Sequence, residues 1–316
     1  MRLRVWRAAI FLTLIACEFS TRRARAESAT DYSVGIESYH ELSLPNGLRA
    51  VIALDRRVPQ VALDIEYAVG DALDPADQPG LAQLVGALLP KLGTRHVQSR
   101  ERRRLFDAAG FKFEEPHVRV GVDTTALSLE VPAEALELAL WVEADRMGFA
   151  AGGVTDSAVK QAEVSAAKLL SKAVTDPNSA TPFWVGLGGA HPYGALVRPA
   201  NFATVTAAVA ASRLRFYNPA TAVLVLVGDV DVQLAEQAIR RYFGPLPSAP
   251  IAQPTVARQA TSPRSLVMEA AISARFAAQV WETPPYLAPD DLGLDVIAAL
   301  LVRRLSAGGV CDKVDA

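Results

Sequence analysis

The stretch "VALDIEYAVGDALDPADQPGLAQLVGALLPKLGT" at residues 61–94 decides the fold. Its opening residues alternate apolar and polar side chains, which is typical of a strand with one buried face. The prolines and aspartates of 73–80 favour a turn. Residues 80–90 are almost wholly apolar and run into a Gly-Thr pair at 93–94. The stretch therefore predicts a strand, a loop and a buried helix in direct succession.

Strands and helices continue on both sides without a strict alternation of the two. Upstream, residues 40–60 predict one strand, with a tight turn at the Asn-Gly pair 46–47. Downstream, the pattern predicts further elements at 99–110 (helix), 118–132 (a long strand or a hairpin), 133–147, 155–172 and 203–217 (helices), 221–230 (strand) and 231–244 (helix). This order indicates an α+β fold, a sandwich of helices packed on a mixed or largely antiparallel sheet.

The chain divides into a long first domain and a short second one. We assign residues 38–247 to the first domain and the Pro/Ser/Ala-rich residues 248–263 to a linker. "LAPDDLGL" at 287–294 echoes "LDPADQPGL" at 73–81, which indicates an internal repeat. Residues 264–316 are therefore expected to begin a second, similar domain, and they are too few to complete it.

The N-terminus has the pattern of an export signal within residues 1–26. Three arginines precede the apolar run "AAIFLTLIA", which is too short to cross a bilayer as a mature helix. Two cleavage modes stay open. "LIAC" resembles a bacterial lipobox, which would leave Cys17 lipidated, whereas "ARA" at 24–26 suits ordinary signal peptidase. We expect an exported bacterial protein, either periplasmic or anchored to the membrane as a lipoprotein.

Composition argues against several function classes. A net charge of −2 gives no electrostatic basis for binding nucleic acid. The two cysteines lie far apart in the sequence and form neither a disulfide framework nor a zinc knuckle. No pair among the four histidines has the spacing of metal ligands; these are His40, His96, His117 and His191.

Several segments, in the right order, resemble the M16 peptidase family of insulinase, pitrilysin and the mitochondrial processing peptidases. They are "LPNGLRAVI" (44–52), the opening stretch 61–94, "HPYG" (191–194), "YNPATAVLVLVGDVD" (217–231) and "YFGPLP" (242–247). The resemblance implies two similar α+β domains per half and a chamber that encloses unfolded peptides. Active members bind zinc through H-x-x-E-H, whose Glu is the general base, and through a Glu on a later helix.

The frame "PGLA" to "LLPKLGT" sets the register of that motif in this chain. Gln83 stands at the first His, Gly86 at the general base and Ala87 at the second His. The third ligand position falls on Lys168, with Glu163 as the other choice. A primary amide is a poor zinc ligand and Gly and Ala offer no donor, so we expect no zinc and a vacated pocket.

The resulting hypothesis is a non-catalytic M16 homologue, a pseudopeptidase. We expect a peptide-binding or structural subunit that partners an active M16 zinc peptidase. The expected partners are that homologue and unfolded peptide; contact with a membrane is expected only through a lipid at Cys17. Two alternatives stay open: an active zinc metalloendopeptidase with a displaced site, and a nonfunctional truncated product.

Overall fold

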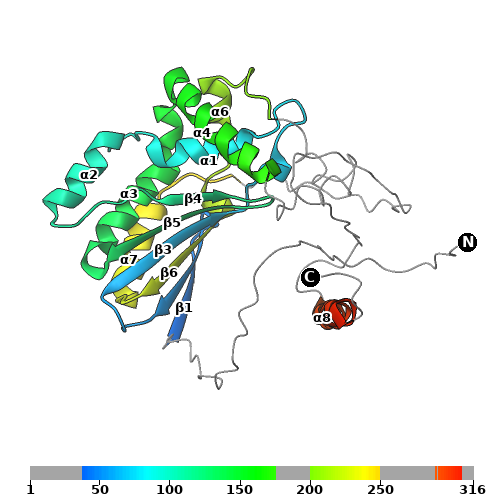
Figure 1. Cartoon of the computed structure of the whole chain (residues 1–316). Coiled ribbons are helices and arrows are strands. Elements are labelled where there is room, and N and C mark those ends of the chain that lie inside the picture. Colours follow the sequence, from blue (N-terminus) through cyan, green and yellow to red (C-terminus); the bar gives the residue numbers. More distant parts are fainter. Residues whose placement is uncertain (1–37, 176–199, 250–288, 290, 308–316) are drawn as a thin grey trace, which may run out of the picture. The chain divides into compact units, whose positions relative to one another are not determined.

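The computed structural model describes residues 38–175, 200–249, 289 and 291–307 (Figure 1). Several features predicted from the sequence lie outside these ranges. They are the export signal 1–26 with Cys17, the turn 191–194 with His191, nearly all of the linker 248–263 and the residues from there to 288. They stay predictions.

A six-stranded mixed sheet organises the described part of the chain, in the order β1-β2-β6-β3-β5-β4 (Figure 1). The strands are β1 (Ser38–Ser43), β2 (Arg49–Leu54), β3 (Gln60–Tyr67), β4 (His117–Val120), β5 (Thr125–Pro132) and β6 (Ala222–Gly228). β2 and β6 pair in parallel, and the other neighbouring strands pair antiparallel. The sheet confirms the predicted α+β class.

Two details of the strand prediction are settled by the structure. Three strands, not two, precede the first helix, because the Asn-Gly turn separates β1 from β2 as a hairpin. Gly47 has φ 93° there, a left-handed conformation that favours glycine. Of the two alternatives for residues 118–132, the hairpin is confirmed, since β4 and β5 pair antiparallel around a turn at 121–124.

The helices cover one face of this sheet. They are α1 (Leu81–Leu88), α2 (Ser99–Ala108), α3 (Leu136–Phe149), α4 (Asp156–Thr175), α6 (Ala207–Leu214) and α7 (Val232–Phe243). Along β3, the alternating side chains from Val61 to Tyr67 are buried, whereas Ala62 and Glu66 on the other face are exposed. Such alternation is expected of a sheet that packs helices on one side.

α8 (Asp291–Ala307) belongs to a second compact unit and is described by itself. It confirms the apolar helix predicted after 287–294. None of the described helices is both long and apolar enough to cross a lipid bilayer.

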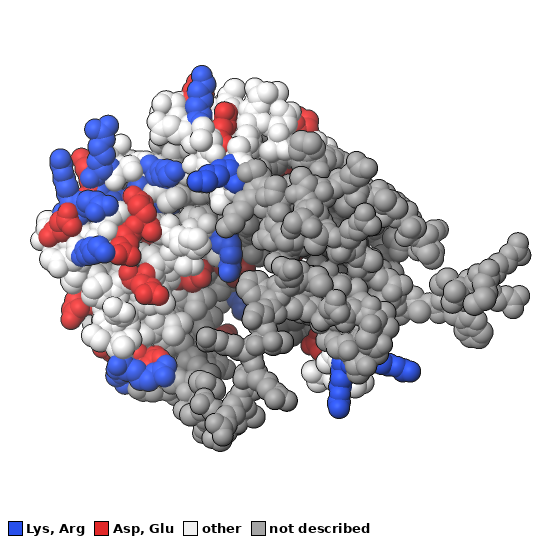
Figure 2. Space-filling view, viewed as in Figure 1, with Lys and Arg blue, Asp and Glu red and all other residues white. Residues whose placement is uncertain are grey.

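Opposite charges are interspersed over the described part of the face shown in Figure 2. Exposed ion pairs of the described residues include Arg57 with Asp55 and Arg240 with Glu236. Such pairs contribute little to stability. The ion pairs with structural weight are the buried ones around α1.

Candidate functional site

α1 has a buried apolar face. Leu81, Leu84, Val85 and Leu88 are at most 3% exposed and belong to the hydrophobic core. Full burial of side chains of this size stabilises the fold by about 1.5–3 kcal/mol each. The helix is therefore fixed in place whether or not it carries catalytic residues.

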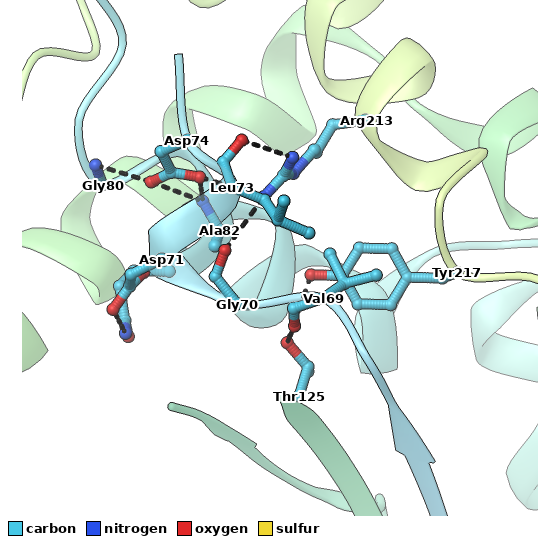
Figure 3. Close-up of polar contacts among 11 residues, drawn as sticks. Val69, Gly70, Asp71, Leu73, Asp74, Gly80, Ala82, Thr125, Arg213 and Tyr217 are labelled. Carbon is cyan, nitrogen blue, oxygen red and sulfur yellow. Dashed lines mark hydrogen bonds and ion pairs between the residues drawn. The ribbon is translucent and has the colours of Figure 1, made fainter. Parts of the chain in front are cut away.

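A buried carboxylate holds the N-terminus of α1. The Asp74 side chain is 5% exposed. It accepts hydrogen bonds from the backbone N–H of Gly80 at 2.9 Å and of Ala82 at 3.0 Å (Figure 3). These are donors that a helix leaves without intrahelical partners, and a negative charge is favourable at this end. Burial raises the pKa of Asp74 to about 7, against the lowering effect of the cation beside it and of the two N–H groups.

That cation is Arg213 of α6, which connects the loop before α1 to α6. Its Nη2 lies 3.2 Å from Asp74 Oδ1. The same guanidinium donates to the carbonyl oxygens of Leu73 at 2.9 Å and Gly70 at 3.1 Å (Figure 3). The loop is thus held by a side chain from far along the sequence.

A second buried guanidinium holds the C-terminal end of α1. Arg146 of α3 is 1% exposed and donates to the carbonyl oxygen of Leu89 at 2.9 Å. Its charge is balanced by Glu143, which is 2% exposed and accepts from Arg146 Nε at 2.8 Å. A cation at the C-terminus of a helix is favoured by the helix dipole.

Arg102 of α2 completes this end. It is 1% exposed and donates to the carbonyl oxygens of Leu92 and Pro90, each at 2.7 Å. These carbonyls follow α1 directly and would otherwise lack partners in the interior. α1 is therefore clamped by buried charged side chains at both ends.

The middle of α1 is packed rather than hollow. A Cβ placed on Gly86 would lie 2.3 Å from Val120 Cγ2 and 3.6 Å from Val118 Cγ1. The edge strand β4 thus fills the space into which a side chain at this position would project. The expectation of a vacated pocket is wrong at Gly86, because β4 closes against the helix there.

Gln83 is engaged in a polar contact. Its Nε2 donates to Asp71 Oδ2 at 2.8 Å and lies 3.4 Å from the carbonyl oxygen of Val120. The other carboxylate oxygen, Asp71 Oδ1, is buried and has no hydrogen-bond partner. Burial raises the pKa of Asp71 to about 6.

The residues present do not fit a zinc ion. The amide nitrogen of Gln83 donates to a carboxylate, Gly86 is packed against a valine, and Ala87 is a half-buried apolar side chain against the core. Zinc needs three protein donors that converge on one point. Across the residues that the structure describes, no group of three or more His, Cys, Asp or Glu side chains could hold a metal ion.

The third ligand position stays a prediction on α4. Lys168 is exposed, whereas Glu163 is half-buried. Glu163 follows Val159 by four residues and precedes Ala166 by three, and both of these are buried. Helical spacing therefore places Glu163 on the inward side of α4 and Lys168 on the outward side.

Two of the described histidines contact carboxylates of other helices. His96 Nδ1 is 2.5 Å from the buried Asp145 Oδ1, and His40 Nε2 is 3.2 Å from Glu236 Oε2. His117 begins β4.

Sequence reasoning missed the polar residues that position α1. It interpreted the loop of Asp74 only as a turn, and Arg213 is 139 residues away from Asp74. Asp74 also lies too far before α1 to be an ordinary N-cap, a place that Gly80 takes with φ 88°. No local pattern could have found this clamp.

Comparison with known proteins adds a family to this fold: residues 207–307 match the family model described as the peptidase M16 inactive domain. That match begins at α6 and runs across 248–263 into α8. No curated protein matches the chain in sequence.

Solved structures show the same fold. The chain is similar to the first half of the periplasmic protease PqqL from Escherichia coli, with 21% identity and a TM-score of 0.55 over 70% of this chain and 49% of that one. A protease from Helicobacter pylori is 18% identical, with a TM-score of 0.55 over 70% of this chain and 53% of that one. A peptidase M16 inactive domain from Pseudomonas fluorescens is 20% identical, with a TM-score of 0.55 over 71% of this chain and 54% of that one.

These findings confirm the resemblance to the M16 peptidases and the fold that it implied. The chain spans about half the length of these three structures. At this level of identity the likeness concerns the fold, and what those proteins cleave is not carried over.

Proposed function

We propose that the chain is a non-catalytic M16 homologue that serves as a peptide-binding or structural subunit beside an active M16 zinc peptidase. One observation carries the proposal: α1 keeps its buried face and both polar clamps, while Gly86 is closed by Val120. Selection for catalysis would not leave these central positions without donors. Selection for a helix that is held in a fixed position in the fold explains both the buried charged residues at its ends and the packing of Val120 against Gly86.

The edge strand β4 offers the means of binding peptide. It is the last strand of the sheet among the described residues and lies beside α1. Because Gly121 N–H donates to the carbonyl oxygen of Thr124, antiparallel alternation turns the backbone groups of Val118 and Val120 away from β5. An extended peptide can add to such an edge through main-chain hydrogen bonds. Gln83 Nε2 lies 3.4 Å from the carbonyl oxygen of Val120, which agrees with a carbonyl group that faces away from β5.

We also propose that the chain is exported. The sequence pattern at residues 1–26 supports export, and the similar PqqL is a periplasmic protease. The active partner is proposed because Gly86 and Ala87 offer no zinc donor, whereas the similar chains are proteases.

The test is the metal content of the purified mature protein, alone and after co-expression with a homologue that carries H-x-x-E-H. We expect far less than one zinc per chain alone, no chelator-sensitive peptide cleavage, and stoichiometric co-purification with the active homologue. A matched control replaces both histidines of the partner's motif, which should remove its zinc but not the complex. Stoichiometric zinc on this chain alone, with cleavage, would favour a displaced-site peptidase instead.

A further inference from the structure

Asp71 and Gln83 meet where the end of β4 approaches α1. Gln83 comes from α1, and Asp71 from the short helical turn Asp71–Leu73 that leads to it. The backbone N–H of Asp71 donates to the carbonyl oxygen of Gly121 at 3.1 Å, just beyond the end of β4. The carboxylate is therefore fixed beside the edge to which a peptide would add.

The charge of Asp71 is not matched by a direct ion pair among the described residues. Arg213, the buried cation of this region, directs its Nη atoms to Asp74 and to the carbonyl oxygens of Gly70 and Leu73. Figure 3 shows Asp71 pointing away from that guanidinium. Gln83 satisfies one carboxylate oxygen, and the other is buried without a donor.

An unsatisfied buried carboxylate oxygen is costly, and a cationic donor is the group that relieves the cost most. A backbone N–H would supply a weaker bond and no charge. The amide of Gln83 holds Oδ2 in place, which leaves Oδ1 as the position for a further donor.

We infer that the Asp71–Gln83 pair binds a cationic side chain, lysine or arginine, of an extended peptide that adds to β4. In the register that the M16 resemblance sets, Gln83 stands at the position of the first zinc ligand, and a peptide cation beside it would supply the counter-charge to Asp71. The inference rests on the proposed peptide binding and names the class of peptide. It predicts selectivity for basic segments.

The test is a set of fluorescent ten-residue extended peptides of threonine, valine and alanine, in which one lysine is moved through each position. Matched peptides carry norleucine, which keeps the length of the side chain without its charge. Binding is measured by fluorescence anisotropy with the full mature chain, its Asp71→Asn variant and its Asp77→Asn variant. Asp77 lies on the same loop but is exposed, so it controls for general charge.

We expect at least one lysine peptide to bind about tenfold more tightly than its norleucine match, the effect of one charge-assisted hydrogen bond. Asp71→Asn should abolish this preference and Asp77→Asn should keep it. Lysine and norleucine peptides that bind equally, or a preference that survives in Asp71→Asn, would overturn the inference while peptide binding stands. If neither series binds, peptide binding fails together with the inference.

Discussion

The two ends of α1 and its middle are built by opposite rules. At the ends, buried charged side chains from the preceding loop, α2 and α3 satisfy backbone groups at or next to the helix termini, and Arg213 of α6 holds the loop before the helix. In the middle, Gly86 offers only space, and β4 fills it. The fold therefore retains what positions the helix and lacks what would make it a zinc site.

The contacts of α1 thus fix its position in the fold and supply no zinc ligand. A buried charge must be matched by partners, so losing any member of a clamp is severe. A small apolar residue can be exchanged as soon as its neighbour adapts. Mutations at the ends and in the middle should differ accordingly in size.

The largest effect is expected from Arg146→Met. It leaves Glu143 without its cation in the interior and the carbonyl oxygen of Leu89 without a donor. We expect a loss of about 3–5 kcal/mol in the free energy of unfolding, measured by urea denaturation. Arg240→Met removes an exposed pair with Glu236 and should change nothing measurable. Equal losses in the two variants would contradict the clamp.

Asp74→Ala tests the other end of α1. The variant deprives the N–H groups of Gly80 and Ala82 of their acceptor and leaves Arg213 with an unmatched charge. We expect a loss of about 2–4 kcal/mol by the same measurement. Asp77→Ala, on the same loop but exposed, should be near neutral. An unchanged free energy of unfolding in Asp74→Ala would show that the loop keeps its conformation without this carboxylate.

The sequence predicted the features that depend on neighbouring residues and missed those that depend on residues far apart in the chain. The strand of β3 and the helix of α1 follow from alternation and apolar runs, which are local patterns. The register of Gln83, Gly86 and Ala87 needed the family resemblance. The filling of Gly86 by Val120 joins residues far apart in the chain, so the expected pocket was wrong there.

A smaller effect is expected in the middle of the helix. Alanine is the better helix former by about 1 kcal/mol, so Gly86→Ala should stabilise an isolated helix. In the folded chain its Cβ would lie 2.3 Å from Val120 Cγ2, and overpacking costs about 1–3 kcal/mol. We expect a net loss of about 1–2 kcal/mol by urea denaturation.

The matched control for this contact is a double-mutant cycle with Val120→Ala, which removes the clashing methyl group. Gly86→Ala should become neutral or stabilising in that background. A loss that persists would show that the backbone, and not Val120, excludes a side chain at this position.

The smallest effect, and the one of opposite sign, is expected from Asp71→Asn. Burial raises the pKa of Asp71 to about 6, above its value of about 3.9 in an unfolded chain, so the native state binds the proton more tightly. Stability falls as the pH rises from about 4 to 6 and the full cost is present above that range. Asparagine keeps an oxygen acceptor for Gln83 Nε2 and carries no charge. We expect a gain of about 1 kcal/mol at pH 8 and none at pH 4, measured by urea denaturation at both values.

A gain that is equal at both pH values would trace the effect to packing instead of charge. A gain confined to high pH has a consequence for the middle of α1. A carboxylate that lowers the stability of the empty protein is retained at a cost, and such costs are typical of residues that serve binding. If Asp71→Asn also loses the preference for lysine peptides, the two results together assign the Asp71–Gln83 pair to ligand binding. The buried charged residues at the two ends of α1 would then be assigned to the stability of the fold.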